Sequence, residues 1–154
     1  MSTQISDAQQ RMEASLRATT EMVAAQCPGT VNEWMLPHLE SCDYAARSCV
    51  YSFSMRKEYA NPGGVALHGG LTGVLFDTAM GHLAHFYCNH MTPTISLQIS
   101  YLRPVPVDRP ILIRCHMDKP GSMMHYLHAE AFTADAPEKL LATATGVYLA
   151  AETH

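Results

Sequence analysis

Apolar residues near the start of the chain recur at intervals of three and four positions. Between Ile5 and Gln26 they are separated by Gln, Arg and Glu, and the pattern ends at Cys27-Pro28-Gly29. This spacing predicts an amphipathic helix that packs one face on the rest of the protein. A second, short helical segment is predicted around residues 31–39, where Pro37 interrupts it.

The longest apolar-rich segment runs from His68 to Tyr87 and contains no proline. It predicts a helix that is buried on more than one face. The segment from Ala45 to Tyr59 carries β-branched and aromatic residues in partial alternation, which predicts a strand. Between them, the sequence NPGG at Asn61–Gly64 predicts a turn.

After Pro93 the period of the apolar residues changes to two. In TISLQISYL, Ile95, Leu97 and Ile99 fall on one face of a predicted strand, and serines and a glutamine fall on the other. Three more strands are predicted at residues 109–117, 123–133 and 140–150. We therefore expect an α+β fold in which a buried helix precedes an antiparallel meander and lies against one face of the sheet.

The composition fits one soluble domain. A chain of 154 residues, 47% of them hydrophobic, can bury a core without disulfides or a metal. The net charge is −4 and the ten Lys and Arg residues are dispersed, which argues against nucleic acid as a partner. Five scattered cysteines, no signal-like amino terminus and no apolar stretch long enough for a bilayer predict reduced thiols, no membrane partner and a cytoplasmic location.

Two adjacent glycines, Gly69 and Gly70, open the helix predicted after His68. The first N–H groups of a helix lack partners and lie at the positive end of the helix dipole. Glycine would let an oxygen with developing negative charge approach those amides. A tight turn that only needs the flexibility of glycine is the alternative, and on these three residues alone it is the favoured explanation.

Asp77 lies in the same predicted helix, between two residues of an apolar run. Burying a carboxylate there is costly unless it is hydrogen-bonded or lines a wet cleft, and an exposed stripe of the helix is the alternative. The Asp77 backbone lies about 12 Å from Gly69 along the helix axis. Either the two features belong to different sites, or Asp77 meets the glycine amides of a second subunit across a two-fold axis, which predicts an obligate dimer.

Two segments match the pattern of a known family. NPGGVALHGGLTGVLFD and the later TISLQISYLRPVP resemble the hotdog-fold acyl-CoA thioesterases of the phenylacetic-acid-degradation (PaaI-like) type, over about residues 48–150. The resemblance implies a sheet wrapped around a long central helix in a thioesterase domain of residues 45–154. The first forty or so residues have no clear counterpart in the family pattern, and we expect residues 1–44 to form a helical extension packed on that domain. It also implies hydrolysis of acyl-CoA to a free acid and CoA by an obligate homodimer, and a dimer of dimers.

The resemblance implies roles for the residues of this motif. The Gly69 N–H would polarise the thioester carbonyl, assisted by Gly70. Asp77 of the partner chain would be the nucleophile or the general base that activates water. Thr94 would position that water, and Asn61 would lie near the thioester. Because thioesters are reactive acyl donors, neither a metal nor a cofactor is required.

Further polar residues around the motif are candidates for substrate binding. His68 belongs to the catalytic group, and orienting the loop is its favoured role. For the CoA phosphates the candidates are Arg56, Lys57, Arg103 and Lys119, which flank the predicted strands and turns.

Two other functions stay open, hydrolysis of acyl groups on acyl carrier protein and binding of acyl chains or CoA without turnover. Asp77 favours an enzyme, because a pure binding protein has little need for a carboxylate beside an acyl pocket. The histidines predict no metal site: His82 and His85 lack a third ligand, and His125 and His128 point to opposite faces of a strand.

Overall fold

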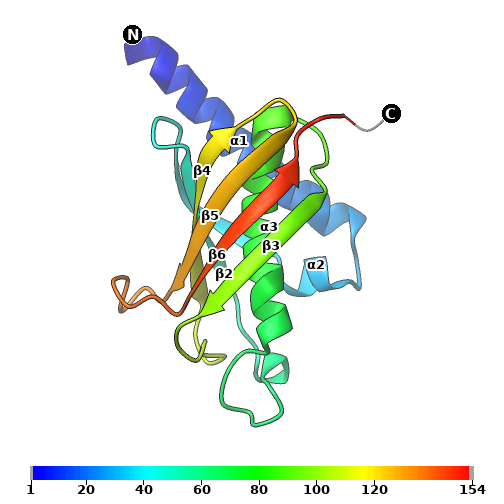
Figure 1. Cartoon of the computed structure of the whole chain (residues 1–154), viewed down its shortest axis with the longest axis vertical. Helices are drawn as coiled ribbons and strands as arrows, with labels where there is room; N and C mark the ends of the chain where they lie inside the picture. Colours follow the sequence, from blue (N-terminus) through cyan, green and yellow to red (C-terminus); the bar gives the residue numbers. More distant parts are fainter. Residues whose placement is uncertain (1, 153–154) are drawn as a thin grey trace.

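Six antiparallel strands form a single sheet, and one long helix packs against it (Figure 1). The computed structural model describes residues 2–152. The elements in chain order are α1 (Ser2–Gln26), α2 (Val31–Trp34), β1 (Pro37–Asp43), β2 (Ser48–Phe53), the short 3-10 helix η1 (Lys57–Tyr59), α3 (Gly69–Cys88), β3 (Thr94–Tyr101), β4 (Ile111–Pro120), β5 (Met124–Phe132) and β6 (Ala142–Leu149). The α+β class and the central helix predicted from the sequence are confirmed.

The order of the strands is β1-β2-β4-β5-β6-β3. Strands β4, β5 and β6 form a meander as predicted, but β3 does not pair with β4, which follows it along the chain. It pairs with β6 at the far edge of the sheet. The prediction that the meander starts with the strand after Pro93 was therefore wrong, because alternation within a strand indicates its two faces and not its neighbour.

The segment between α1 and β2 also differs from the prediction. The helix α2 ends at Trp34, and Pro37 begins strand β1 instead of interrupting a helix. Proline is tolerated at the first residue of an edge strand, where a missing N–H costs no ladder hydrogen bond. Because β1 pairs with β2, the sheet starts before the domain boundary predicted at residues 44/45. Strand β2 is shorter than predicted, since Arg47 adopts a positive φ of 53° just before it.

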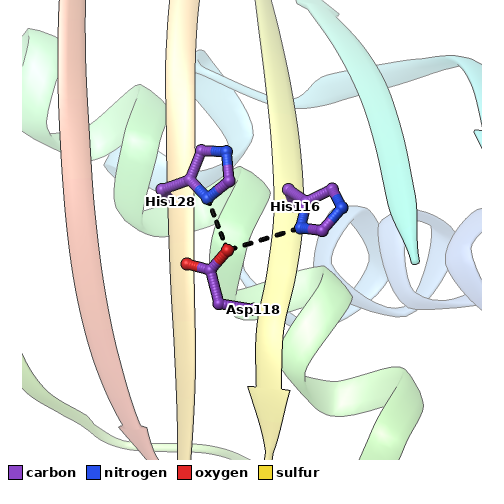
Figure 2. A group of neighbouring side chains, drawn as sticks. All are labelled: His116, Asp118 and His128. Carbon is purple, nitrogen blue, oxygen red and sulfur yellow. Dashed lines mark hydrogen bonds and ion pairs between the residues drawn. The ribbon is translucent and has the colours of Figure 1, made fainter. Parts of the chain in front are cut away.

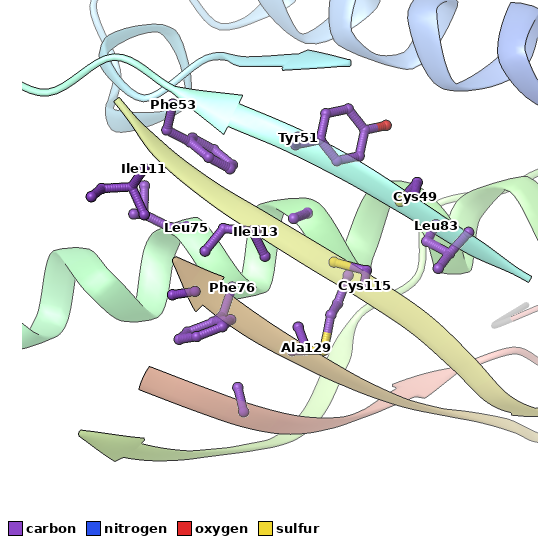
Figure 3. Packing of buried hydrophobic residues seen from close by; sticks show 14 of the residues in the cluster. Cys49, Tyr51, Phe53, Leu75, Phe76, Leu83, Ile111, Ile113, Cys115 and Ala129 are labelled. Atoms are coloured by element: carbon purple, nitrogen blue, oxygen red, sulfur yellow. The ribbon is translucent and has the colours of Figure 1, made fainter. Parts of the chain in front are cut away.

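The core lies between α3 and the inner face of the sheet (Figure 3). Leu75 and Phe76 of α3 are fully buried and face a layer of equally buried residues from β2 and β4, namely Phe53, Ile111 and Ile113. Each such side chain contributes roughly 1.5–3 kcal/mol of burial free energy. This packing fixes α3 on the sheet and so fixes the positions of both ends of the helix.

The helix α1 packs on β1 and α3 (Figure 1). Met12 and Leu16 on its inner face are fully buried. Gln9 adds polar contacts, since its side chain donates to the Cys42 carbonyl at 2.8 Å and accepts from the Tyr44 N–H at 2.8 Å. Neither α1 nor any other helix within residues 2–152 is long and apolar enough to cross a membrane.

Candidate active site

The first turn of α3 forms one half of the candidate site. His68 is the N-cap residue, and its Nδ1 atom accepts a hydrogen bond from the Gly70 N–H at 3.0 Å. The Gly69 N–H has no hydrogen-bond partner within residues 2–152. Gly69 is therefore the open donor at the positive end of the helix, whereas the Gly70 N–H is already engaged.

Gly70 packs more tightly at this turn than Gly69, where a Cβ atom would make an ordinary contact. A Cβ atom at Gly69 would lie 3.4 Å from the Tyr101 hydroxyl oxygen, which donates to the Gly69 carbonyl at 2.7 Å. A Cβ atom at Gly70 would lie 3.3 Å from the His68 Nδ1 atom. The two explanations considered for the glycines, tight packing and access to an amide, are therefore compatible with each other.

An open hollow of about 650 Å³ lies beside this turn. Its wall contains Asn61, Gly69 and Gly70 together with Tyr101 and Arg103 from the end of β3 and the loop that follows. The Asn61 Oδ1 atom accepts from the Val65 N–H at 3.2 Å and so holds the loop before α3 in place. The Arg103 guanidinium donates to the Leu140 carbonyl at 2.6 Å. The hollow is thus lined by polar backbone and side-chain groups at the N-terminus of α3.

Asp77, two helical turns further along, forms the other half of the candidate site. Its side chain is half-buried, and its Oδ1 atom accepts hydrogen bonds from the Thr94 hydroxyl at 2.7 Å and the Tyr148 hydroxyl at 3.0 Å. Its Oδ2 atom has no hydrogen-bond partner among the described residues. The carboxylate is thus oriented by two hydroxyl groups and keeps one oxygen for another molecule.

Tyr148 was not among the residues predicted from the sequence. It is 1% exposed, and burial, followed by the nearby Asp77 charge, raises the pKa of its hydroxyl. The hydroxyl therefore stays protonated and acts as a donor near neutral pH. Its partnership with Asp77 depends on the β3–β6 register, in which Thr94 lies opposite Tyr148. Periodicity within one strand contains no information about that register.

A bulge in β3 turns Thr94 toward the helix. Thr94 pairs with Tyr148 and Ser96 pairs with Val147, so Ile95 is an extra residue without a partner in the ladder. In a regular strand Thr94 would share the face of Ser96. The bulge instead places the Thr94 hydroxyl on the side of Asp77, and bulges of this kind often redirect a side chain beside a functional site.

The Asp77 half opens into a second cavity, of about 310 Å³. This cavity lies between α3, α1 and the start of β3. Its wall contains Asp77, Gly81, His82, His85, Thr94, Tyr148 and, from α1, Thr19, Met22 and Val23. Burial lowers the pKa of His82 to about 4, which keeps the His82 ring uncharged near neutral pH. The helix α1 therefore forms part of the wall of this cavity.

Within one subunit the two halves stay apart. The two cavities have no lining residue in common. The structure places Gly69, Gly70, Asn61 and His68 at one end of α3, and Asp77 with Thr94 further along the helix.

The predicted CoA-binding residues are also dispersed. Of the four, only Arg103 lines either cavity. The Arg56 guanidinium lies over the Tyr59 ring, 6.0 Å from its centroid, and Lys57 is in η1 next to it. Lys119 pairs with Tyr126 at the opposite end of the sheet from Arg103.

Known proteins share this fold. Residues 65–139 match the family model described as the thioesterase superfamily. The PaaI protein of the Escherichia coli phenylacetic acid degradation operon has 16% identity and a TM-score of 0.78, with 94% of this chain and 96% of that chain covered. Thioesterase superfamily member 2 from Mus musculus has 21% identity and a TM-score of 0.71, with 87% and 93% covered. A phenylacetic acid degradation-related protein from Ralstonia eutropha has 22% identity and a TM-score of 0.70, with 84% and 97% covered.

A comparison with curated protein sequences finds no match. The matched segment, residues 65–139, contains all of α3 and strands β3 to β5, which carry the first turn of the helix, Asp77 and Thr94. The hotdog fold implied by the sequence motifs is confirmed by the shared architecture. The chain has the hotdog fold, its residues 65–139 match the thioesterase superfamily model, and it resembles PaaI-like proteins in structure.

Proposed function

We propose that this protein hydrolyses acyl-CoA thioesters to a free acid and CoA. The observation that carries the proposal is the Asp77 carboxylate, oriented by the Thr94 and Tyr148 hydroxyls at the wall of a cavity of about 310 Å³. A carboxylate held in this way beside an apolar wall suits acyl transfer to water. The match to the thioesterase superfamily supports thioester hydrolysis.

The open Gly69 N–H supplies the complementary group. It would donate a hydrogen bond to the thioester carbonyl oxygen and stabilise the negative charge that develops there. As a general base, Asp77 would take a proton from water while the water oxygen bonds to the acyl carbon. The C–S bond then breaks, and CoA leaves as a thiolate that recovers the proton. As a nucleophile, Asp77 would attack the acyl carbon, the C–S bond would break to release the CoA thiolate, and water would hydrolyse the resulting acyl anhydride in a second step.

Thr94 is suited to hold the attacking water. Its hydroxyl proton is already donated to Asp77, at 2.7 Å, so its oxygen is left to accept a hydrogen bond. A water that donates to Thr94 and to the unpaired Oδ2 atom of Asp77 would be oriented by both residues. This arrangement supports the role of Thr94 that the resemblance implies.

The complete site would form between two subunits. Strand β3 is at the edge of the sheet, and its two ends carry the two half-sites: the Thr94 hydroxyl contacts Asp77, and the Tyr101 hydroxyl contacts the Gly69 carbonyl. If two β3 strands pair antiparallel about a two-fold axis, the Asp77 end of one subunit comes to lie beside the Gly69 end of the other. This pairing would bridge the separation of about 12 Å within one helix.

A thiol-release assay over a panel of acyl-CoAs tests the proposed activity. We expect turnover by the wild-type protein and a loss of kcat of about 10²–10⁴-fold in Asp77→Asn, which keeps the size of the side chain but not its basicity. Asp135→Asn, a change at an exposed aspartate on the loop after β5, is the matched control and should retain full activity.

The outcomes of this assay separate the competing functions. Absence of turnover with every acyl-CoA would favour a binding protein, and unchanged turnover in Asp77→Asn would remove the catalytic role of that residue. Comparing the same acyl group on CoA and on acyl carrier protein identifies the preferred carrier.

A further inference from the structure

The face of the sheet that is turned away from α3 carries a separate group of polar side chains (Figure 2). His116 of β4 and His128 of β5 lie directly opposite each other in the strand register. Asp118 follows on β4, and Figure 2 shows its carboxylate directed toward both rings. This group contributes no residue to the two cavities of the candidate active site.

A β-bulge places the carboxylate in this group. Met117 pairs with Leu127 and Lys119 pairs with Tyr126, which leaves Asp118 as the extra residue in β4. The bulged position frees Asp118 from the ladder, so its side chain can turn toward the paired histidines. The sequence shows only that His116 and Asp118 are two residues apart on one strand; the third member comes from the register.

The distances within the group are short. The Asp118 Oδ1 atom lies 2.7 Å from the Nδ1 atom of His128 and 3.5 Å from the Nδ1 atom of His116. The two rings are stacked, with centroids 5.1 Å apart and planes inclined by 22°. Both imidazoles thus present the same ring nitrogen to one carboxylate oxygen.

Only one of the two histidine Nδ1 atoms is within hydrogen-bond distance of a partner in the described part of the chain. His128 is within hydrogen-bond distance of Asp118, but the His116 Nδ1 atom is shielded from solvent and has no hydrogen-bond partner among residues 2–152. An unpaired nitrogen in such a position is unfavourable. A cation bound between the three side chains would accept the lone pair of each nitrogen and one from the carboxylate.

We propose that His116, Asp118 and His128 bind a divalent cation of the zinc class. Two imidazole nitrogens and one carboxylate oxygen suit zinc and neighbouring transition metals, whereas calcium and magnesium prefer oxygen ligands alone. Tetrahedral coordination with bonds of about 2.0–2.2 Å separates ligand atoms by roughly 3.3–3.5 Å. The observed separations of 2.7 and 3.5 Å bracket this range, so small side-chain rotations would suffice.

The surroundings of the group permit binding. The three side chains are 42%, 45% and 47% exposed for His116, Asp118 and His128, so the group lies at the protein surface, and a rotation of the His116 ring would open its shielded Nδ1 atom to a cation. The neighbouring Arg114 on the same face is paired with Glu130 at 3.1 Å, which offsets its positive charge. Because the folded register creates the group, binding would stabilise the folded state and link β4 to β5.

Calorimetric titration of the chelator-treated, full-length protein with Zn²⁺ tests the site. We expect one Zn²⁺ per subunit and a loss of affinity of more than about tenfold in His128→Gln and Asp118→Asn. His38→Gln is the matched control, since His38 is also exposed on a strand but pairs only with Glu40. It should leave the affinity unchanged.

Two further measurements keep this test decisive. Zn²⁺ should raise the melting temperature of the wild-type protein and of His38→Gln, but not that of His128→Gln. A titration with Co²⁺ checks the ligands, because cysteine thiolates would add a charge-transfer absorption that imidazole and carboxylate ligands do not. Equal affinity in all variants, or a thiolate absorption with Co²⁺, would overturn the proposal.

Discussion

The Asp77 carboxylate is oriented by hydroxyl groups from β3 and β6, the two strands at one edge of the sheet. Tyr148 supplies one of them from a fully buried position. Its ring also packs in the core, so replacing it by phenylalanine removes the hydroxyl and keeps the packing. The side chain would act by positioning Asp77, because its hydroxyl donates to that carboxylate.

We predict that Tyr148→Phe lowers kcat about tenfold, because one hydrogen bond that orients the carboxylate is lost, a contribution of about 1.4 kcal/mol. KM should change little, since the hydroxyl is directed at Asp77. Steady-state kinetics of acyl-CoA hydrolysis measure both parameters. An unchanged kcat would show that Tyr148 only packs in the core.

His82 makes the stability of the fold depend on pH. Burial, with a smaller contribution from the charge of His85, lowers the pKa of His82 from 6.5 to about 4. Between these two values the unfolded chain binds more protons than the folded one, so stability falls as pH falls through this window and is fully present above about pH 6.5. The full effect is on the order of 3 kcal/mol.

We predict that His82→Leu reduces the loss of stability between pH 7 and pH 4, because leucine fills the site without a proton-binding group. Urea unfolding of the wild-type protein and the variant at both pH values measures the difference. Parallel losses in the two proteins would contradict a role for His82 in the acid sensitivity.

The residues of the candidate site differ in how far the sequence could predict them. Gly69 and Asp77 stand out because poor helix formers and a carboxylate are unexpected in an apolar helix. Tyr148 and the group around Asp118 do not stand out, since a tyrosine or an aspartate is unremarkable in a strand. Their partners are set by the register, which depends on contacts between distant segments.

At the scale of elements, the start of α3 depends on its cap. His68 accepts the Gly70 N–H at 3.0 Å and so satisfies one of the free donors of the first turn. This contact agrees with orienting the loop, the role favoured for His68. It also keeps the Gly70 N–H away from substrate in this conformation.

We predict that His68→Ala lowers the free energy of unfolding by about 0.5–2 kcal/mol, and that His68→Asn restores most of it, because asparagine also offers an acceptor at the N-cap. Urea unfolding at pH 7 measures both changes. If the asparagine variant is no more stable than the alanine variant, the hydrogen bond to Gly70 does not support the helix.

Elements with a strong period were predictable and their arrangement was not. The patterns of α1, α3 and the four strands after Pro93 locate these elements to within a few residues. Strand β1, with the sequence PHLESCD, escaped prediction because it starts with proline and carries charged and polar residues. The position of β3 at the far edge of the sheet also has no signal in the local sequence. The nine-residue connection, residues 102–110, is long enough for β3 to pair with any of several strands.

At the scale of the whole molecule, the proposed function requires a second subunit. The Gly69 and Asp77 half-sites line separate cavities. Each end of the edge strand β3 lies beside one half-site, Thr94 beside Asp77 and Tyr101 beside Gly69. Ile95 and Tyr101 on this strand are 52% and 56% exposed in the single chain, and a paired β3 would cover part of that apolar surface. The active unit would then be a dimer with two identical sites.

The Gly69 half-site can be blocked without disturbing the helix. Gly69 is the first residue of α3, where proline is well tolerated, and His68 has φ −56° and ψ 132°, values suited to a residue before proline. Gly69→Pro removes the N–H group and should lower kcat about 10²–10³-fold. Gly69→Ala keeps the N–H group and is the matched control, with a much smaller loss expected.

The central claim, a site shared between subunits, is tested most directly by mixed dimers. Asp77→Asn and Gly69→Pro chains carrying different affinity tags are co-expressed, and the dimer with one chain of each is purified and assayed with acyl-CoA. Each variant alone should be almost inactive, whereas the mixed dimer regains one intact site and about half of the wild-type activity. A mixed dimer as inactive as its parents would show that each chain carries its own complete site.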